Sequence, residues 1–191
     1  YSNIEYGITS KYELKASDLV VLVLGNRSSS THIYGIVPEH KLRSGDILDL
    51  LSGAGMAGKA INIPSRFNAE TTQFELIGFI SKDGKKVLNT LDFASVSIKN
   101  TNPNVPSIFI GGSSAQVGKT TFARNLLKAI KQLKSETKVS VIKATGTGSA
   151  KYHDLYKEAG ADFTMDYVEF GHPSTYGMDA NIFADVMRNM L

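Results

Sequence analysis

At 191 residues, with 42% hydrophobic and 20% charged side chains, the chain has the composition of a globular protein with one large domain or two small ones. It contains no cysteine, which excludes disulfide frameworks, thiol catalysis and cysteine metal ligands. Its net charge of +3 suits an anionic small molecule, but the Lys and Arg residues are too scattered to predict a nucleic-acid partner. No apolar run reaches the roughly 20 residues that cross a bilayer, and the start lacks a signal-peptide pattern, so we predict no membrane partner and a cytoplasmic location.

The first half of the chain predicts a mostly-β domain over residues 1–101. Short β-rich runs alternate with clusters of Gly, Asn, Ser and Asp at the spacing of strands and turns. We predict a small barrel or sandwich whose strands cover residues 19–24, 32–37, 46–51, 60–63, 74–80 and 87–91.

Within this half, residues 53–60 read Gly-Ala-Gly-Met-Ala-Gly-Lys-Ala and satisfy the spacing of two phosphate-binding motifs. However, Ala60 lacks the metal-binding hydroxyl, and the next residues alternate like a strand and include a proline, so no helix N-terminus faces this loop. We interpret the segment as a glycine-rich hairpin turn.

Residues 99–106 are polar, hold two prolines and show no apolar periodicity, so we interpret them as an interdomain linker with its boundary near residue 102. The remaining residues, 102–191, alternate between strand and helix patterns. A strand at 107–111, a helix at 119–134 and a strand at 138–142 form a βαβ unit, which predicts an α/β domain with a parallel sheet.

A third cycle follows, with a helix at 152–159, a strand at 163–168 and a terminal helix from residue 180. The terminal helix has no stop signal and the chain starts with Tyr1 instead of Met, so we expect the natural protein to continue past Leu191.

The loop between the strand at 107–111 and the next helix has the composition of a phosphate-binding P-loop. In such a loop, backbone N–H groups surround phosphate oxygens, and the helix N-terminus adds a partial positive charge. Lys119 is predicted to reach the β- and γ-phosphates, and the Thr120 hydroxyl to ligate Mg²⁺. We therefore predict that ATP with Mg²⁺ is bound by Gly112, Ser113, Ser114, Ala115, Gln116, Val117, Gly118, Lys119, Thr120 and Thr121.

Five residues rather than four separate Gly112 from Gly118, and Ser113 occupies the first glycine position of the standard motif. This longer loop resembles the phosphate loop of the dethiobiotin synthetase family, and the segment also resembles bacterial P-loop proteins of uncertain function that join a β domain to such a loop. The resemblance covers roughly residues 107–175 and implies an ATP- and Mg²⁺-dependent enzyme.

The strand at 138–142 leads into Lys143 and a flexible turn, Ala-Thr-Gly-Thr-Gly-Ser, at the edge of the sheet where ligands bind. In the family that the chain resembles, a lysine and turn at this place contact the acidic group of the substrate, which implies that Lys143, Thr145 and Gly146 bind substrate. The alternative is a surface lysine before an ordinary loop. The loop at 169–176 loosely resembles the substrate loop of that family, which implies contacts from His172 and Thr175.

The same resemblance implies that Asp154 joins Thr120 as a Mg²⁺ ligand, with Asp166 competing for this role. A helix-capping or surface aspartate is the alternative for both. His32, His40 and His153 show no metal-ligand spacing with one another.

These residues predict an ATP-dependent ligase or synthetase that phosphorylates a small acidic substrate, with Lys119 and Lys143 as catalytic residues. One alternative is a nucleotide-dependent switch or accessory protein. Another is a group transferase that uses the loop to bind a phosphorylated cofactor such as coenzyme A. We also expect the protein to form a homo-oligomer.

Overall fold

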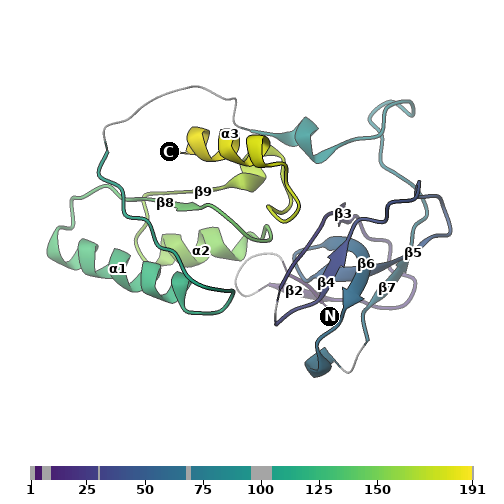
Figure 1. The fold of residues 1–191 in the computed structure, drawn as a ribbon, viewed down its shortest axis with the longest axis horizontal. Coiled ribbons are helices and arrows are strands. Elements are labelled where there is room, and N and C mark those ends of the chain that lie inside the picture. The colour runs from purple at the N-terminus through teal and green to yellow at the C-terminus, as the bar shows by residue number, and fades with distance from the viewer. Residues whose placement is uncertain (1–2, 6–9, 30, 68–69, 96–104, 191) are drawn as a thin grey trace.

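The computed structural model of the chain describes residues 3–5, 10–29, 31–67, 70–95 and 105–190 (Figure 1). The protein is a mixed α/β structure, with strands of the first half gathered on one side and the α-helices on the other. The predicted linker and the boundary at residue 102 lie largely outside the described residues. None of the helices in the described part of the chain has the length and apolar character needed to cross a bilayer.

The first half forms a curled, half-barrel sheet of five strands in the order β3-β6-β5-β7, with β4 also pairing β6. Its inner face buries Ile33, Leu51 and Met56, which are at most 3% exposed. A separate antiparallel pair is formed by β1 and β2. The strands are β1 Asn3–Glu5, β2 Lys11–Glu13, β3 Val23–Leu24, β4 Tyr34–Ile36, β5 Ile47–Ser52, β6 Met56–Asn62 and β7 Gln73–Glu75.

The central strand β5 carries a buried carboxylate that joins three strands. Asp49 is 3% exposed, and its side chain accepts hydrogen bonds from Ala60 N at 2.8 Å, Thr71 Oγ1 at 2.5 Å and Gln73 Nε2 at 3.3 Å. Lys59 Nζ lies 3.7 Å from the same carboxylate. The hairpin interpretation of residues 53–60 is confirmed, because residues 53–55 turn between β5 and β6, and Lys59 lies within β6.

Three of the predicted strands of this half are largely wrong. The expected strand at 19–24 forms only as the two residues of β3, and Leu19 and Val21 before it are 79% and 73% exposed. The expected strand at 74–80 ends with β7 at Glu75, and Ile77 and Phe79 beyond it are 65% and 46% exposed. The expected strand at 87–91 contributes only an isolated bridge at Val87, and the chain then forms the 3₁₀ helix η2 (Thr90–Phe93). A capping box stabilises η2 instead of a strand. Asn89 Oδ1 accepts a hydrogen bond from Leu91 N, and Asp92 Oδ2 accepts one from Asn89 N.

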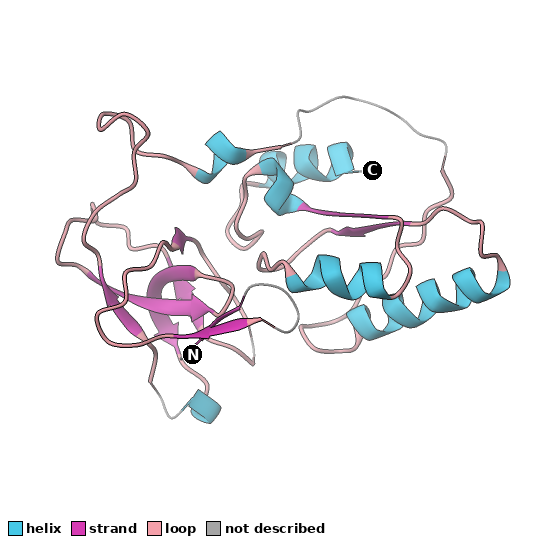
Figure 2. Ribbon diagram, turned by 180° about the vertical axis from the view of Figure 1, so that it is seen from behind, coloured by secondary structure: helices cyan, strands magenta, loops and turns pink. Residues whose placement is uncertain are grey.

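The second half contains the helices α1 (Lys119–Leu133), α2 (Lys151–Glu158) and α3 (Ala180–Met190) and the parallel strands β8 (Ser140–Lys143) and β9 (Phe163–Asp166). The helices α1 and α2 lie on one face of the β8–β9 pair and α3 on the other (Figure 2). Between α3 and the strands, Tyr167, Phe170, Val186 and Met190 form a buried cluster with Ile142 and Met165 packed against it.

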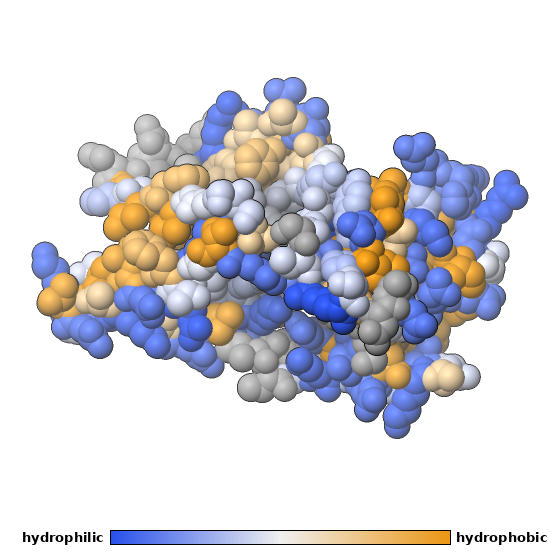
Figure 3. Space-filling model, turned by 60° about the horizontal axis from the view of Figure 1, so that its bottom comes forward, coloured by the Kyte–Doolittle hydropathy of each residue, from blue (hydrophilic) through white to orange (hydrophobic). Residues whose placement is uncertain are grey.

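The predicted strand at 107–111 is not formed, so the predicted parallel P-loop sheet is not confirmed, and the second half has the two-stranded parallel pair β8–β9 within the described residues. Ile108 and Phe109 are 67% and 89% exposed. Parallel strands are stable when both of their faces are covered, and this segment has no such cover. Figure 3 shows exposed apolar side chains on the surface of the molecule, and Ile108 and Phe109 are among the exposed apolar residues.

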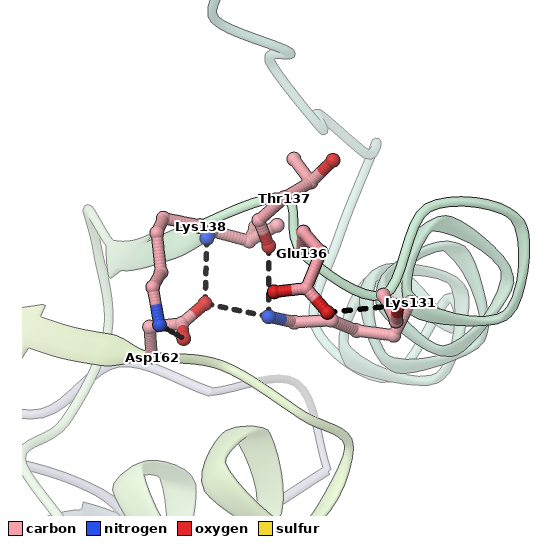
Figure 4. Close-up of polar contacts among 7 residues, drawn as sticks. Lys131, Glu136, Thr137, Lys138 and Asp162 are labelled. Atoms are coloured by element: carbon pink, nitrogen blue, oxygen red, sulfur yellow. Dashed lines mark hydrogen bonds and ion pairs between the residues drawn. The ribbon is translucent and has the colours of Figure 1, made fainter.

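The C-terminal end of α1 is fixed by one carboxylate at the start of β9. Asp162 accepts hydrogen bonds from Lys131 Nζ of α1 at 2.7 Å, from Lys138 Nζ at 3.2 Å and from Val139 N at 2.8 Å (Figure 4). The hydrogen bond from Lys131, followed by that from Val139, holds the pKa of Asp162 well below its ordinary value. Asp162 therefore ties α1, β8 and β9 together at the end opposite to the predicted phosphate loop.

The 3₁₀ helix η2 packs against a second one, η3 (Tyr167–Phe170), which directly follows β9. Gly171 ends η3 with a φ of +83°, and a Cβ there would lie 2.7 Å from Leu91 Cα of η2. Ser95 N also donates to Glu169 O at 2.8 Å. Residues before the predicted linker thus form part of the packing around β9.

Candidate functional site

The predicted phosphate loop leads directly into α1, as the sequence indicates. Gly118 adopts the left-handed region with a φ of +91°, Gln116 has a φ of +64°, and the helix begins at Lys119. No side chain caps the first turn of α1. The N–H groups at this helix start are therefore available to an anion, and the helix dipole favours negative charge there.

Lys119 folds back across the loop. Its Nζ donates to Ser114 O at 2.5 Å, and its side chain passes close to Gly112. A Cβ at Gly112 would lie 2.7 Å from Val117 Cγ2 and 3.1 Å from Lys119 Cδ, so glycine is required for this compact arrangement. The lysine ammonium is thereby held over the loop backbone, where the sequence predicts a phosphate.

Thr120, in the first turn of α1, lies near the hydroxyl of Tyr156 on α2. Tyr156 is 8% exposed, and this burial raises the pKa of its hydroxyl, while the nearby Thr120 lowers it less. A threonine hydroxyl oxygen has two lone pairs and can ligate a cation, so the residue type of Thr120 suits the predicted role of a Mg²⁺ ligand. The second predicted ligand, Asp154, lies in the first turn of α2.

Lys143 ends β8, and its ammonium is enclosed. Its Nζ donates to Thr147 O at 2.8 Å and to Tyr167 Oη at 3.3 Å, and lies 4.0 Å from the ring centroid of Tyr152. Burial lowers the pKa of Lys143 to about 8, although the charge of Asp166 acts in the opposite direction. This environment is unlike that of an ordinary surface lysine.

The turn after Lys143 is held against the loop that the sequence also predicts to contact substrate. Gly146 N donates to Thr175 Oγ1 at 3.0 Å, and Thr175 N donates to Gly146 O at 3.1 Å. A Cβ at Gly146 would lie 3.4 Å from Lys143 Nζ. The structure therefore brings Lys143, Gly146 and Thr175 together at one edge.

The other two predicted substrate contacts lie at the margins of this edge. Thr145 is exposed at the start of the turn. His172 donates its backbone N–H to Tyr167 O at 3.2 Å, and partial burial lowers the pKa of its ring.

The sequence analysis missed a cluster of three titratable side chains on α2, β9 and η3. His153 Nε2 lies 3.4 Å from Asp166 Oδ2 and 3.7 Å from Glu169 Oε1. Asp166 is 1% exposed and is the register partner of Lys143 across the parallel pair. Asp154, which the resemblance assigned to metal, is the chain neighbour of His153 but does not belong to this cluster.

The loop before α1 and the carboxyl ends of β8 and β9 lie at the same end of the α/β part and face the β-rich part (Figures 1 and 2). Lys151, the first residue of α2, forms an ion pair with Glu5 of β1 at 3.2 Å. Tyr176 packs edge-on against Tyr34, with ring centroids 5.9 Å apart. These contacts place the half-barrel beside the edge that carries Lys143.

Comparisons of the chain with protein families, with curated proteins and with solved structures found no match. The chemistry of the site is therefore argued from its geometry. The arrangement combines an uncapped helix start and a lysine suited to phosphates with an enclosed ammonium suited to a second anion.

Proposed function

We propose that residues 112–121 bind the phosphates of Mg²⁺-bound ATP and that the protein transfers a phosphoryl group to a small acidic acceptor held by Lys143. The observation that carries this proposal is the enclosed ammonium of Lys143, at the same end of the α/β part as the phosphate loop. Two cationic groups at one end suit a reaction between two anions, which repel each other in the absence of compensating charge.

The ammonium of Lys143 has a donor left for the acceptor. A lysine ammonium carries three protons. Two of them are directed at Thr147 O and Tyr167 Oη. The third has no hydrogen-bond acceptor among the described residues, where Nζ otherwise faces the Tyr152 ring, and in this proposal it donates to the carboxylate of the acceptor.

Lys119 and the start of α1 supply the positive charge on the nucleotide side. The ammonium of Lys119 lies over the loop at Ser114 O, and a bound phosphate would replace that carbonyl as its partner. The N–H groups of the first turn of α1 add donors that point in the same direction. Thr120, with Asp154 on α2, would hold the Mg²⁺ ion, which supplies charge neutralisation for the transferring group when bound.

A nucleotide-dependent switch is the second candidate, and the contact between the two parts of the molecule favours it. Lys151 belongs to α2, the helix whose Tyr156 lies near Thr120, and its ion pair with Glu5 joins α2 to the β-rich part. A nucleotide that displaced Thr120 from Tyr156 would act on this contact. The enzyme and the switch differ in whether a second substrate stimulates turnover.

The test starts with thermal unfolding of the full chain in the presence of ATP, GTP or acetyl-coenzyme A, with and without Mg²⁺. ATP with Mg²⁺ at about 100 times its Kd should raise the unfolding midpoint by roughly 5–10 °C. ADP release is then measured with a panel of small carboxylic acids. A shift with acetyl-coenzyme A alone would support the transferase, and ATP binding without stimulation by any acid would support the switch.

A further inference from the structure

The side chains of His153, Asp166 and Glu169 converge on one point beside the end of β9. One ligand atom of each residue, the imidazole Nε2 or a carboxylate oxygen, lies within 4.8 Å of the other two. His153 comes from α2, Asp166 ends β9, and Glu169 lies in η3. Three separate elements thus deliver the donor atoms, and their convergence depends on the tertiary fold.

A capping box explains why one oxygen of each carboxylate faces this point. Asp166 Oδ1 accepts from Val168 N at 2.7 Å, and Glu169 Oε2 accepts from Asp166 N at 2.9 Å. The capping of η3 therefore uses one oxygen of each carboxylate. The remaining oxygens, Asp166 Oδ2 and Glu169 Oε1, are the two that approach His153.

The oxygen Asp166 Oδ2 is buried and has no hydrogen-bond partner within the described residues. His153 Nε2 is 3.4 Å away, but this contact does not meet the geometry of a hydrogen bond. A fully buried carboxylate oxygen without a partner costs about 1–3 kcal/mol, or more when it is charged. The oxygen and the imidazole nitrogen point toward a shared space, as two ligands of one cation do.

A second contact fixes the orientation of the histidine. His153 Nδ1 lies 2.9 Å from Thr164 Oγ1, and Thr164 is 9% exposed. Metal-binding histidines commonly use their second ring nitrogen in this way, because the contact sets the ring orientation and the tautomer. With Nδ1 occupied by Thr164, Nε2 is the nitrogen directed at Asp166 and Glu169.

We propose that His153, Asp166 and Glu169 bind one divalent first-row transition-metal ion of the Mn²⁺ or Zn²⁺ class. An imidazole nitrogen favours these ions over Mg²⁺ and Ca²⁺, which prefer oxygen ligands alone. Two carboxylates balance the charge of the ion, and three protein ligands leave coordination positions open. This site is separate from the Mg²⁺ ligands Thr120 and Asp154 and does not depend on nucleotide binding.

The test uses the full chain, freed of metal with a chelator and studied without nucleotide. Isothermal titration with Zn²⁺, Mn²⁺ and Mg²⁺ should give one bound Zn²⁺ or Mn²⁺ per chain, at least tenfold tighter than Mg²⁺. Glu169→Gln and His153→Gln should each weaken binding by tenfold or more. In Glu169→Gln the amide oxygen can still accept from Asp166 N, so the capping of η3 is retained while the anionic ligand is lost.

His40→Gln is the matched control, because His40 Nε2 also lies 3.6 Å from a carboxylate, Asp46 Oδ2, but on an exposed surface and without a second acid. Its metal affinity should equal that of the wild type. Circular dichroism of each variant confirms that it is folded. The proposal is overturned if the wild type binds no Zn²⁺ or Mn²⁺, or if folded Glu169→Gln and His153→Gln variants bind the ion as tightly as the wild type.

Discussion

Lys143 and Asp166 are register partners at the carboxyl ends of β8 and β9, so the lysine and the buried aspartate lie opposite each other on neighbouring parallel strands. Their proximity raises the pKa of Lys143 against the larger lowering effect of burial. This edge is the place where open parallel sheets bind their ligands.

Replacement of the enclosed ammonium should separate binding from turnover. Lys143→Ala should retain ATP affinity and lose acceptor-stimulated ADP release by roughly ten- to a hundredfold, because one charge-assisted contact of about 1.5–3 kcal/mol is removed. Calorimetry and steady-state kinetics measure the two effects. A loss of ATP affinity as large as that of Lys119→Ala would instead make Lys143 a phosphate ligand.

Turnover should also depend on pH through Lys143. Burial lowers the pKa of this lysine from 10.5 to about 8, while the charge of Asp166 raises it and that of Lys151 lowers it. The ammonium is therefore lost as the pH rises through about 8. Acceptor-stimulated ADP release should therefore fall on the alkaline side of about pH 8. The residual activity of Lys143→Ala should lack this step, and a step of equal size in the variant would refute the assignment.

The two glycine-rich segments offer a matched pair of lysine variants. Lys119→Ala should abolish nucleotide binding in a folded protein, because the lysine supplies charge at a helix start and contributes little packing. Lys59→Ala should leave ATP affinity within about threefold, because Lys59 lies in β6 and pairs with Asp49. Titration calorimetry compares both variants, and equal losses would mean that the wrong segment was assigned to the nucleotide.

The half-barrel should depend on its buried carboxylate. Asp49→Ala should lower the free energy of unfolding by about 2–4 kcal/mol, because the hydrogen-bond donors of Ala60, Thr71 and Gln73 lose their partner. Urea denaturation measures this loss. Asp83→Ala, which removes an exposed turn carboxylate, is the control and should change the denaturation midpoint less.

The same carboxylate predicts an acid effect on stability. Burial raises the pKa of Asp49, but the hydrogen bonds from Thr71, Ala60 and Gln73 outweigh it, and the net pKa lies below the ordinary value of 3.8. A lowered pKa stabilises the fold above pH 3.8, and this contribution is lost as the pH falls below it. The wild type should therefore lose stability on acidification more steeply than Asp49→Ala, as measured by urea midpoints between pH 5 and pH 3.

Local patterns in the sequence predicted the elements of the second half well. The glycine before Lys119 and the apolar periodicity after it predict α1 correctly, and the parallel pairing of β8 with β9 follows from the helix between them. The apolar run at 107–111 was predicted as a strand because hydrophobicity alone does not reveal whether neighbouring strands cover it. Ile108 and Phe109 are exposed because no described strand or helix covers this segment.

The cluster of His153, Asp166 and Glu169 could not be predicted from spacing, because His153 meets the two acids only when α2 lies against β9. In the sequence, the spacing Asp166-x-x-Glu169 after the predicted strand indicates only a helix cap. Only the fold shows that the same two residues also present their second oxygens to a histidine.

The packing of η2 on η3 limits where the molecule can be divided. Ser95 N donates a hydrogen bond to Glu169 O, and Leu91 lies against Gly171. Ser95 and Leu91 both precede the linker predicted at 99–106. A fragment that starts at residue 102 would lose these contacts and leave the segment carrying Glu169 uncovered. The shortest polypeptide that preserves the support of the cluster must therefore begin before the Asn89 cap of η2, and limited proteolysis within the linker should leave both pieces associated.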